Sequence, residues 1–245
     1  MTSNPSTLAA LRGEPSYVWR AGQERRLQMV ATWATLQDAY VLEAGGGVGM
    51  YASQFRRRYT PHVELFDIEL ERVIEAQSET PTAIVAAAEY LPYPDNYFDT
   101  ILSHEVLEHV IDDRASVAEM ARVLKIGGRM VIFVPNRWYP FETHGHYWKG
   151  EYHFGNTPLI NYLPNIWRNK LAPHVRAYTK RGLNKLFAGL PLKKVHHRRI
   201  YGGYDNIIAK LGTPAKWIRN TLYLGEGTPL DTWGLSHFVV LEKTE

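Results

Sequence analysis

The sequence of 245 residues contains no cysteine. This absence excludes disulfides, a thiolate nucleophile and cysteine-ligated zinc or iron–sulfur sites, so any metal would rest on His, Asp and Glu. The sequence also lacks any run near the roughly 18 to 20 apolar residues that a membrane-spanning helix needs, and its first residues lack the charged start and long apolar stretch of a secretory signal. We therefore expect a cytoplasmic protein without a membrane span.

Composition and length favour one elaborated domain. Hydrophobic residues make up 45% of the chain and charged residues 22%, which is typical of a globular protein and not of a disordered one. We expect a single domain over 1–245, made of an N-terminal helical cover (1–37), a ligand-binding core (38–136), an inserted substrate lid (137–178) and C-terminal strands and helices (179–245).

The net charge of +3 is unevenly distributed. Residues 168–219 hold 13 Lys or Arg against Asp205 alone, whereas the rest of the chain is acidic. The segment 158–200 interleaves cations with aromatic residues and leucines, and it has four interpretations: a mouth for an anionic small substrate, a contact with a lipid bilayer, a groove for nucleic acid, or a solubilising face. No RNA- or DNA-binding module is recognisable, which argues against nucleic acid.

Apolar segments alternate with helical patterns along the chain. The predicted elements are a helix at 17–36, strands at 39–44, 62–67, 82–87, 98–104 and 129–135, helices at 48–58, 69–77 and 106–124 between them, and then a helix at 179–187 and strands at 192–200 and 234–243. This alternation predicts an α/β fold with a doubly wound, mostly parallel sheet and helices on both faces. A ligand should bind at the carboxyl ends of the strands.

The most informative segment is the glycine turn at 45–49, which lies between the first strand and a helix. Glycines tolerate positive φ and let a ligand approach the backbone, and a helix N-terminus offers unpaired N–H groups. The turn is not a phosphate P-loop, because Met50 and Tyr51 follow Gly49 where Lys and Ser or Thr are required. It is not the dinucleotide fingerprint G-x-G-x-x-G either, because the third glycine would fall on Met50. The pattern favours a turn that binds a nucleoside cofactor.

An acidic residue ends the second strand eighteen residues after Gly49. The carboxylate of Asp67 can accept hydrogen bonds from both hydroxyls of a ribose, and a hydrogen bond to a charged group contributes about 1.5 to 3 kcal/mol. The competing interpretation is that Asp67 caps the helix that begins near Ile68, and the two roles are compatible.

The glycine turn, Asp67 and the segment AAAEYLPYPDNYFDTILSHEVLEHV at 86–110 resemble the class I S-adenosylmethionine-dependent methyltransferases, particularly the ubiquinone/menaquinone-like small-molecule subgroup. The resemblance covers about residues 38–136. It implies a Rossmann-like methyltransferase fold with an antiparallel last of seven strands, S-adenosyl-L-methionine as the cofactor, and methyl transfer to O, N or C of a small molecule that is hydrophobic or anionic. The competing functions are a nicotinamide-dependent oxidoreductase and a non-catalytic cofactor-binding protein of methyltransferase descent.

The resemblance also implies cofactor-binding residues. In the family the glycine turn lies beside the methionine part of the cofactor, an acid at the position of Glu43 supports the turn, and an apolar residue at the position of Ile68 packs on adenine. The family usually has Asp at the position of Ala87; here the backbone N–H of Ala88 and the carboxylate of Glu89 are the candidates to replace that adenine contact. The implied set is Glu43, Gly45, Gly46, Gly47, Asp67, Ile68, Ala88, Glu89 and Ser103.

Three histidines are the candidate catalytic residues. A sulfonium methyl is already activated, so alignment of the acceptor should supply most of the rate, and a general base is needed only for a protonated hydroxyl or amine. His104 and His109 follow the fourth strand, and His144 lies in the lid. An i,i+4 pair with Glu105 on a helix explains His109 equally well, and an ordinary loop explains His144.

The lid segment combines aromatic residues with histidines. Its aromatic side chains suit a small organic acceptor. The group Glu142, His144, His146 and His153 would also suit a metal ion, but the H-x-H spacing alone is weak evidence, and no metal is predicted. The arginines of the N-terminal helix fit a solvated face better than a cofactor contact, so none is assigned to the site.

Overall fold

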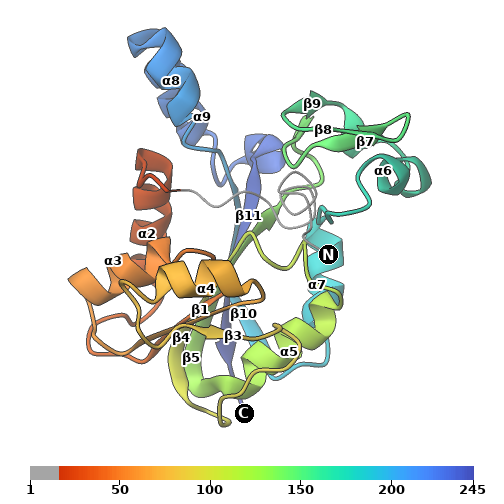
Figure 1. Cartoon of the computed structure of the whole chain (residues 1–245). Coiled ribbons are helices and arrows are strands. Elements are labelled where there is room, and N and C mark those ends of the chain that lie inside the picture. Colours follow the sequence, from red (N-terminus) through yellow and green to blue (C-terminus); the bar gives the residue numbers. More distant parts are fainter. Residues whose placement is uncertain (1–16) are drawn as a thin grey trace.

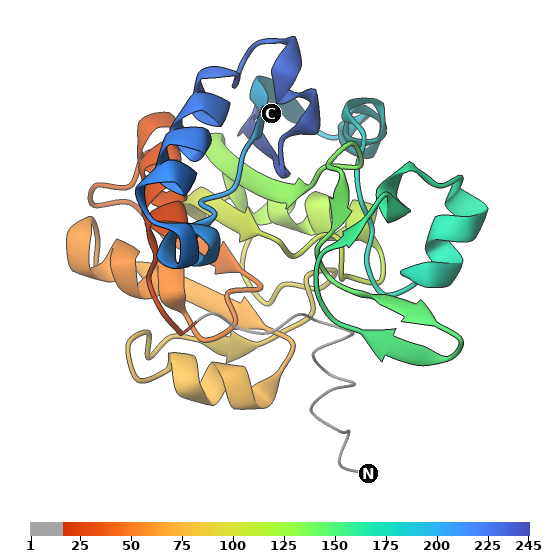
Figure 2. The same cartoon turned by 90° about the horizontal axis from the view of Figure 1, so that it is seen from above.

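The computed structural model describes residues 17–245, and at its centre is a seven-stranded sheet with helices on both faces (Figures 1 and 2). The strand order is β10-β11-β5-β4-β1-β2-β3, with β1 to β5 parallel and β11 antiparallel to both β5 and β10. The strands are β1 (Val41–Ala44), β2 (Val63–Asp67), β3 (Ile84–Val85), β4 (Phe98–His104), β5 (Leu124–Pro135), β10 (Leu192–Ile200) and β11 (Ser236–Lys243). The predicted doubly wound sheet with an antiparallel last strand is confirmed.

Helices cover both faces because alternate residues of each buried strand point to opposite sides of the sheet. Along β5, Val131 and Phe133 belong to one core cluster, whereas Met130, Ile132 and Val134 belong to the other. The first cluster includes residues of α2 (Ala21–Trp33), α3 (Met50–Arg58) and α4 (Leu70–Ala76), and the second includes residues of α5 (Asp113–Val123) and α7 (Lys180–Phe187).

The helix predicted over 106–124 is shorter in the structure, because α5 begins only at Asp113. Asp112 caps it by accepting hydrogen bonds from the N–H groups of Arg114 and Ala115, both at 2.9 Å. The preceding stretch consists of turns, and Glu105 has a φ of 55°. The helical i,i+4 pair of Glu105 and His109 therefore does not form, and that interpretation of His109 was wrong.

Other boundaries differ from the predictions by a few residues. The helix expected at 17–36 is α2, which ends at Trp33, and the edge strand expected at 82–87 pairs only over Ile84–Val85. Thr179 caps α7 as expected, since its hydroxyl accepts a hydrogen bond from the N–H of Gly182 at 3.0 Å. Residues 1–16 of the expected N-terminal cover lie outside the described residues.

The lid segment forms small elements although its sequence shows no clear period. The elements are β6 (Phe141–Glu142) paired with β9 (Thr157–Pro158), the hairpin of β7 (His146–Trp148) and β8 (Glu151–His153), η1 (Ile160–Tyr162) and α6 (Asn165–Leu171). A buried ion pair joins two of them: Nη2 of Arg168 in α6 lies 2.8 Å from Oε2 of Glu142 in β6. Long-range polar contacts, which leave no periodic pattern, hold this segment together.

Two further helices, α8 (Asp205–Leu211) and α9 (Thr213–Leu224), project at the same end of the sheet as the lid (Figure 1), and η2 (Pro229–Trp233) follows them. They carry apolar residues that are largely exposed, among them Trp217, Ile218 and Leu224. Across residues 17–245, no helix has the length and apolar character required to cross a membrane.

Candidate active site

The glycine turn after β1 has a backbone geometry that glycine adopts more readily than other residues. The angle φ is 64° at Gly45 and 56° at Gly47. A Cβ at Gly45 would lie 2.6 Å from Val106, and a Cβ at Gly46 would lie 2.5 Å from Leu65, so both positions are packed against the protein. A Cβ at Gly47 would meet nothing within 4 Å. The turn is therefore open at Gly47, where a ligand can approach the backbone.

Two carboxylates hold this turn in place. Oε2 of Glu43 accepts a hydrogen bond from the N–H of Ala52 at 2.6 Å, and burial raises the pKa of Glu43 to about 8. Oδ2 of Asp67 accepts from the N–H of Gly47 at 2.9 Å, and its Oδ1 accepts from the N–H of Glu69 at 3.0 Å. Each Asp67 oxygen keeps a second lone pair for a ligand hydroxyl, so a structural role and a ribose-binding role are compatible.

A cavity of about 560 Å³, which we call the cofactor cavity, lies in front of the turn. Its lining includes the predicted residues Glu43, Gly45, Gly46, Gly47, Asp67, Ile68, Ala88, Glu89, His104, His109 and His144. Ser103 does not line it, because its side chain is fully buried within β4. The sequence therefore located this cavity, with Ser103 as the exception.

The cavity is lined by Ala87 at the position where the resemblance leads one to expect an aspartate for adenine. Ile68 is 50% exposed and offers an apolar side chain, and Ala88 also lines the cavity. Oε1 of Glu89 already accepts hydrogen bonds from the N–H groups of Ile111 and Asp112, each at 3.0 Å. Glu89 thus holds the segment that leads into α5, in addition to lining the cavity.

An arginine that the sequence did not single out, Arg26, lies beside the cofactor cavity in contact with its lining residues His104 and Glu105. Nη1 of Arg26, in α2, lies 2.5 Å from Nε2 of His104, and its Nη2 lies 3.6 Å from Oε1 of Glu105. Burial, reinforced by the Arg26 charge, lowers the pKa of His104 to about 3, so His104 stays neutral and its Nε2 lone pair faces the guanidinium. Arg20, Arg25 and Arg26 are indistinguishable in sequence; only the tertiary fold shows which of them enters the site.

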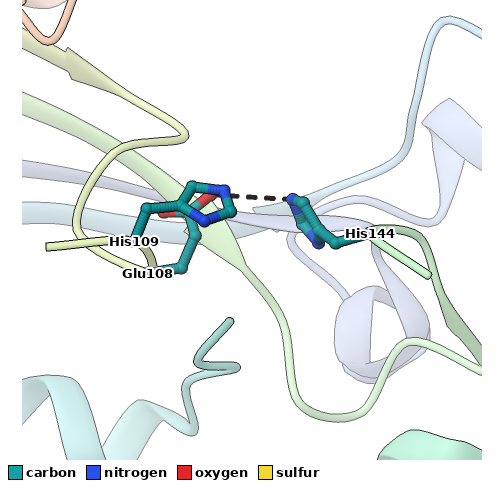
Figure 3. A group of neighbouring side chains, drawn as sticks. All are labelled: Glu108, His109 and His144. Atoms are coloured by element: carbon teal, nitrogen blue, oxygen red, sulfur yellow. Dashed lines mark ion pairs between the residues drawn. The ribbon is translucent and has the colours of Figure 1, made fainter. Parts of the chain in front are cut away.

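The lid contributes His144 to a cluster with two residues of the turn after β4 (Figure 3). Nε2 of His144 lies 3.9 Å from Oε1 of Glu108, and the rings of His144 and His109 have centroids 5.3 Å apart. Burial, together with the neighbouring His144, lowers the pKa of His109 to about 4. Glu108 is 1% exposed and was not singled out from the sequence, because it resembles any other acid in a presumed helix.

Two further cavities lie close by, the first sharing lining residues with the cofactor cavity and the second sharing lining residues with the first. A polar chamber of about 190 Å³ shares Glu105 and Thr143 with the cofactor cavity, and Arg26 and Ser236 also line this chamber. An apolar cavity of about 850 Å³ shares Tyr139 and Phe141 with the polar chamber. Its other lining residues come largely from α8, α9 and η2 and include Ile207, Leu211, Ile218, Leu222, Leu230 and Trp233.

The residues present fit a ligand with an adenosyl group. The carboxylate at the end of β2 faces the turn, Gly47 is open to the cavity, and the apolar surface of Ile68 lies at the far end. Solved structures share this fold. An S-adenosylmethionine-dependent methyltransferase from Mesorhizobium loti matches 91% of this chain and 98% of its own with a TM-score of 0.63 at 16% identity. The [4+2]-cyclase SpnF matches 92% and 83% with a TM-score of 0.59, also at 16% identity.

These features define a Rossmann-like fold of the methyltransferase type. Residues 42–132 match the family described as a methyltransferase domain, and this core is similar to the class I S-adenosylmethionine-dependent methyltransferases, which use S-adenosyl-L-methionine as their cofactor. The ubiquinone/menaquinone biosynthesis C-methyltransferase UbiE of Cupriavidus metallidurans is 32% identical over 140 residues, which are 50% of this chain and 57% of that protein. The enzyme of the same name from Cupriavidus taiwanensis is 34% identical with the same coverage. The matched part is thus little more than half the length of these curated relatives.

Proposed function

We propose that the chain transfers a methyl group from S-adenosylmethionine to a small molecule that carries an apolar portion. The observation that supports this most is the series of three cavities joined by shared lining residues. Glu105 and Thr143 belong to both the cofactor cavity and the polar chamber, and Tyr139 and Phe141 belong to both the polar chamber and the apolar cavity. An acceptor with its apolar portion between the lid and α9 would present its polar end to the cofactor cavity.

The chain's own residues bind and align the reactants in this proposal. Gly47 and Asp67 hold the cofactor, which when bound supplies an electrophilic methyl group. Arg26 and Glu105 position the polar end of the acceptor, and the lid residue Thr143 closes the chamber against water. Alignment of this kind can contribute about 7 to 11 kcal/mol to lowering the barrier.

The candidate histidines differ in what their positions support. His109 and His144 line the cofactor cavity next to the lid, where an acceptor enters, and we keep both as candidates for contact with the acceptor. The Nε2 of His104 faces Arg26 at 2.5 Å, which supports a role in positioning that guanidinium. Proton removal by any of the three stays a prediction.

The acceptor atom is O, N or C in this proposal. The relatives are named C-methyltransferases of ubiquinone and menaquinone biosynthesis, and the apolar cavity is compatible with an acceptor of that kind. The fold by itself does not define the reaction, because a cyclase shares it. Methyl transfer therefore has to be measured for this chain.

The test uses methyl-labelled S-adenosylmethionine and a series of ring acceptors with alkyl chains of increasing length. We expect label in the product, and a KM that falls as the chain lengthens. Ile218→Arg should raise KM for the long-chain acceptors, because Ile218 lines the apolar cavity, whereas the adjacent Trp217→Arg should not, because Trp217 lies outside that lining. Tight binding of S-adenosylhomocysteine without label transfer to any acceptor would support the non-catalytic alternative, and binding of NAD instead would support an oxidoreductase.

A contact between the basic segment 158–200 and a lipid surface also stays a prediction, as does a cytoplasmic location. Ile166 and Trp167 of α6 are 67% and 66% exposed and precede Lys170, a combination that suits an anionic bilayer surface. The protein should sediment together with vesicles that contain anionic lipid. Equal co-sedimentation with neutral vesicles would contradict an electrostatic contact.

A further inference from the structure

We propose that Glu108, His109 and His144 bind one divalent transition-metal ion between the core and the lid (Figure 3). Each of the three side chains offers one ligand atom, and these atoms lie within 4.8 Å of one another. Glu108 and His109 belong to the turn after β4, whereas His144 comes from the lid. An ion at this position would fasten the lid to the core beside the cofactor cavity.

The buried carboxylate of Glu108 is the first reason. Glu108 is 1% exposed, and neither of its oxygens has a hydrogen-bond partner within residues 17–245. A buried carboxylate without donors is costly, and buried charges are normally paired or coordinate a metal. The neighbouring side chain of Glu105 is a second carboxyl group, which offers no positive charge to offset that of an ionised Glu108. The Nδ1 of His109 is likewise buried and has no hydrogen-bond partner.

The orientation of His144 is the second reason. Its Nδ1 lies 3.2 Å from Oε1 of Glu142, and the same oxygen accepts a hydrogen bond from the backbone N–H of His144 at 3.1 Å. The ion pair with Arg168 holds Glu142 in place.

The Nδ1 of His144 is thus directed at Glu142, and its Nε2 is directed at Glu108. This is the carboxylate–histidine arrangement that typically supports a metal ligand. It also leaves two acceptor atoms, Nε2 of His144 and Oε1 of Glu108, facing each other at 3.9 Å. Tetrahedral zinc sites place neighbouring ligand atoms about 3.3 Å apart, so a small movement of the lid would complete the site.

The donor set indicates the class of ion. Two imidazoles and one carboxylate suit zinc and neighbouring transition metals, whereas magnesium and calcium prefer oxygen ligands alone. Three protein ligands leave a coordination position open, and His109 and His144 line the cofactor cavity, so a hydroxyl or carboxylate oxygen of the acceptor is the ligand class that would fill it. This assignment of the open position rests on the proposed function; binding of the ion does not.

The sequence-based expectation was different. The residues grouped there with His144 were Glu142, His146 and His153. In the structure Glu142 contacts Nδ1 of His144, the ring nitrogen on the side away from Glu108. His146 and His153 stack on each other across the β7–β8 hairpin with ring centroids 5.3 Å apart. Glu108 and His109 take the place of those residues beside His144 because the fold brings the turn after β4 under the lid.

The test is a calorimetric titration of Zn²⁺ into metal-free protein, together with the visible absorption spectrum after addition of Co²⁺. We expect one equivalent of Zn²⁺ and the intense bands of a low-symmetry Co²⁺ site. Glu108→Gln and His144→Asn should each weaken Zn²⁺ binding by about 100-fold or more and abolish those bands, since even supporting residues cost about 10- to 100-fold. His153→Asn, a matched change elsewhere in the lid, should leave both readouts unchanged.

Two outcomes overturn the site: wild-type protein that shows no saturable Zn²⁺ binding, or His144→Asn protein that binds Zn²⁺ as tightly as wild type. If Glu108→Gln does not fold, His144→Asn decides alone, because His144 lies on the lid and its loss leaves the core intact. S-adenosylhomocysteine is titrated into the same wild-type preparation. If the protein binds S-adenosylhomocysteine but not Zn²⁺, only the metal site is overturned. If it binds Zn²⁺ but not S-adenosylhomocysteine, only the proposed function is overturned.

Discussion

The carboxylate of Asp67 accepts a hydrogen bond from the backbone N–H of Gly47 at 2.9 Å, which ties the carboxyl end of β2 to the turn that follows β1. The same carboxylate faces the cofactor cavity. In the function proposed above, this side chain both shapes the glycine turn and accepts hydrogen bonds from the ribose of the cofactor.

Replacement of Asp67 by Ala should weaken the binding of S-adenosylhomocysteine by about 10- to 150-fold, because a hydrogen bond to a charged group contributes about 1.5 to 3 kcal/mol. Isothermal titration calorimetry measures the change. The control is Glu71→Gln in α4, which removes an exposed acid from the same region of the chain. An unchanged dissociation constant for Asp67→Ala would remove this residue from the binding site.

Gly47 and Gly127 offer a matched pair of substitutions. Both have positive φ, 56° and 77°, and a Cβ at either position meets nothing within 4 Å. Each change to Ala should cost roughly 1 kcal/mol of unfolding free energy through backbone strain. Only Gly47→Ala should also weaken S-adenosylhomocysteine binding, because its methyl group enters the cofactor cavity. Equal affinities of the two variants would contradict the placement of the cofactor at Gly47.

The buried Glu43 predicts a pH dependence of stability. Its pKa is about 8 in the folded chain against 4.5 as a model value, so the folded chain binds more protons between these pH values. Its contribution to stability is complete below pH 4.5 and is lost as the pH rises toward 8, with a slope of up to about 1.4 kcal/mol per pH unit. The variant Glu43→Gln has no titratable group at this position. Between pH 5 and pH 8, the free energy of unfolding in urea should therefore fall more for the wild type than for the variant. Parallel curves would show that the Glu43 carboxylate is stabilised in a way the structure does not show.

The ion pair between Arg168 and Glu142 should stabilise the folded conformation of the lid. Arg168→Met leaves a buried carboxylate without its cation, and such a loss typically costs about 3 to 5 kcal/mol. Amide hydrogen exchange should show faster exchange in β6 and η1, with protection of β4 and β5 unchanged. The double variant with Glu142→Gln should recover much of the protection. Uniform loss of protection in lid and core would mean that the lid does not open as a separate unit.

The sequence predicted the parts of the fold that depend on local pattern. Apolar runs located the strands, and the cap at Thr179 and the glycine turn were found because a few adjacent residues define them. The prediction of one long helix over 106–124 was wrong at its N-terminal part. Glu89, which is distant in sequence, accepts hydrogen bonds from the N–H groups of Ile111 and Asp112 and holds that stretch as turns. Arg26 and Glu108 were missed for the same reason. Their roles arise from partners in other elements, which a periodic pattern cannot show.

The most direct test of the central claim is a crystal structure of the chain with S-adenosylhomocysteine. We predict that the ribose hydroxyls lie within hydrogen-bond distance of Asp67, that the amino acid part lies along Gly47, and that the sulfur faces the polar chamber lined by Arg26 and Glu105. A ligand bound elsewhere, or a glycine turn that holds a pyrophosphate group, would contradict the account.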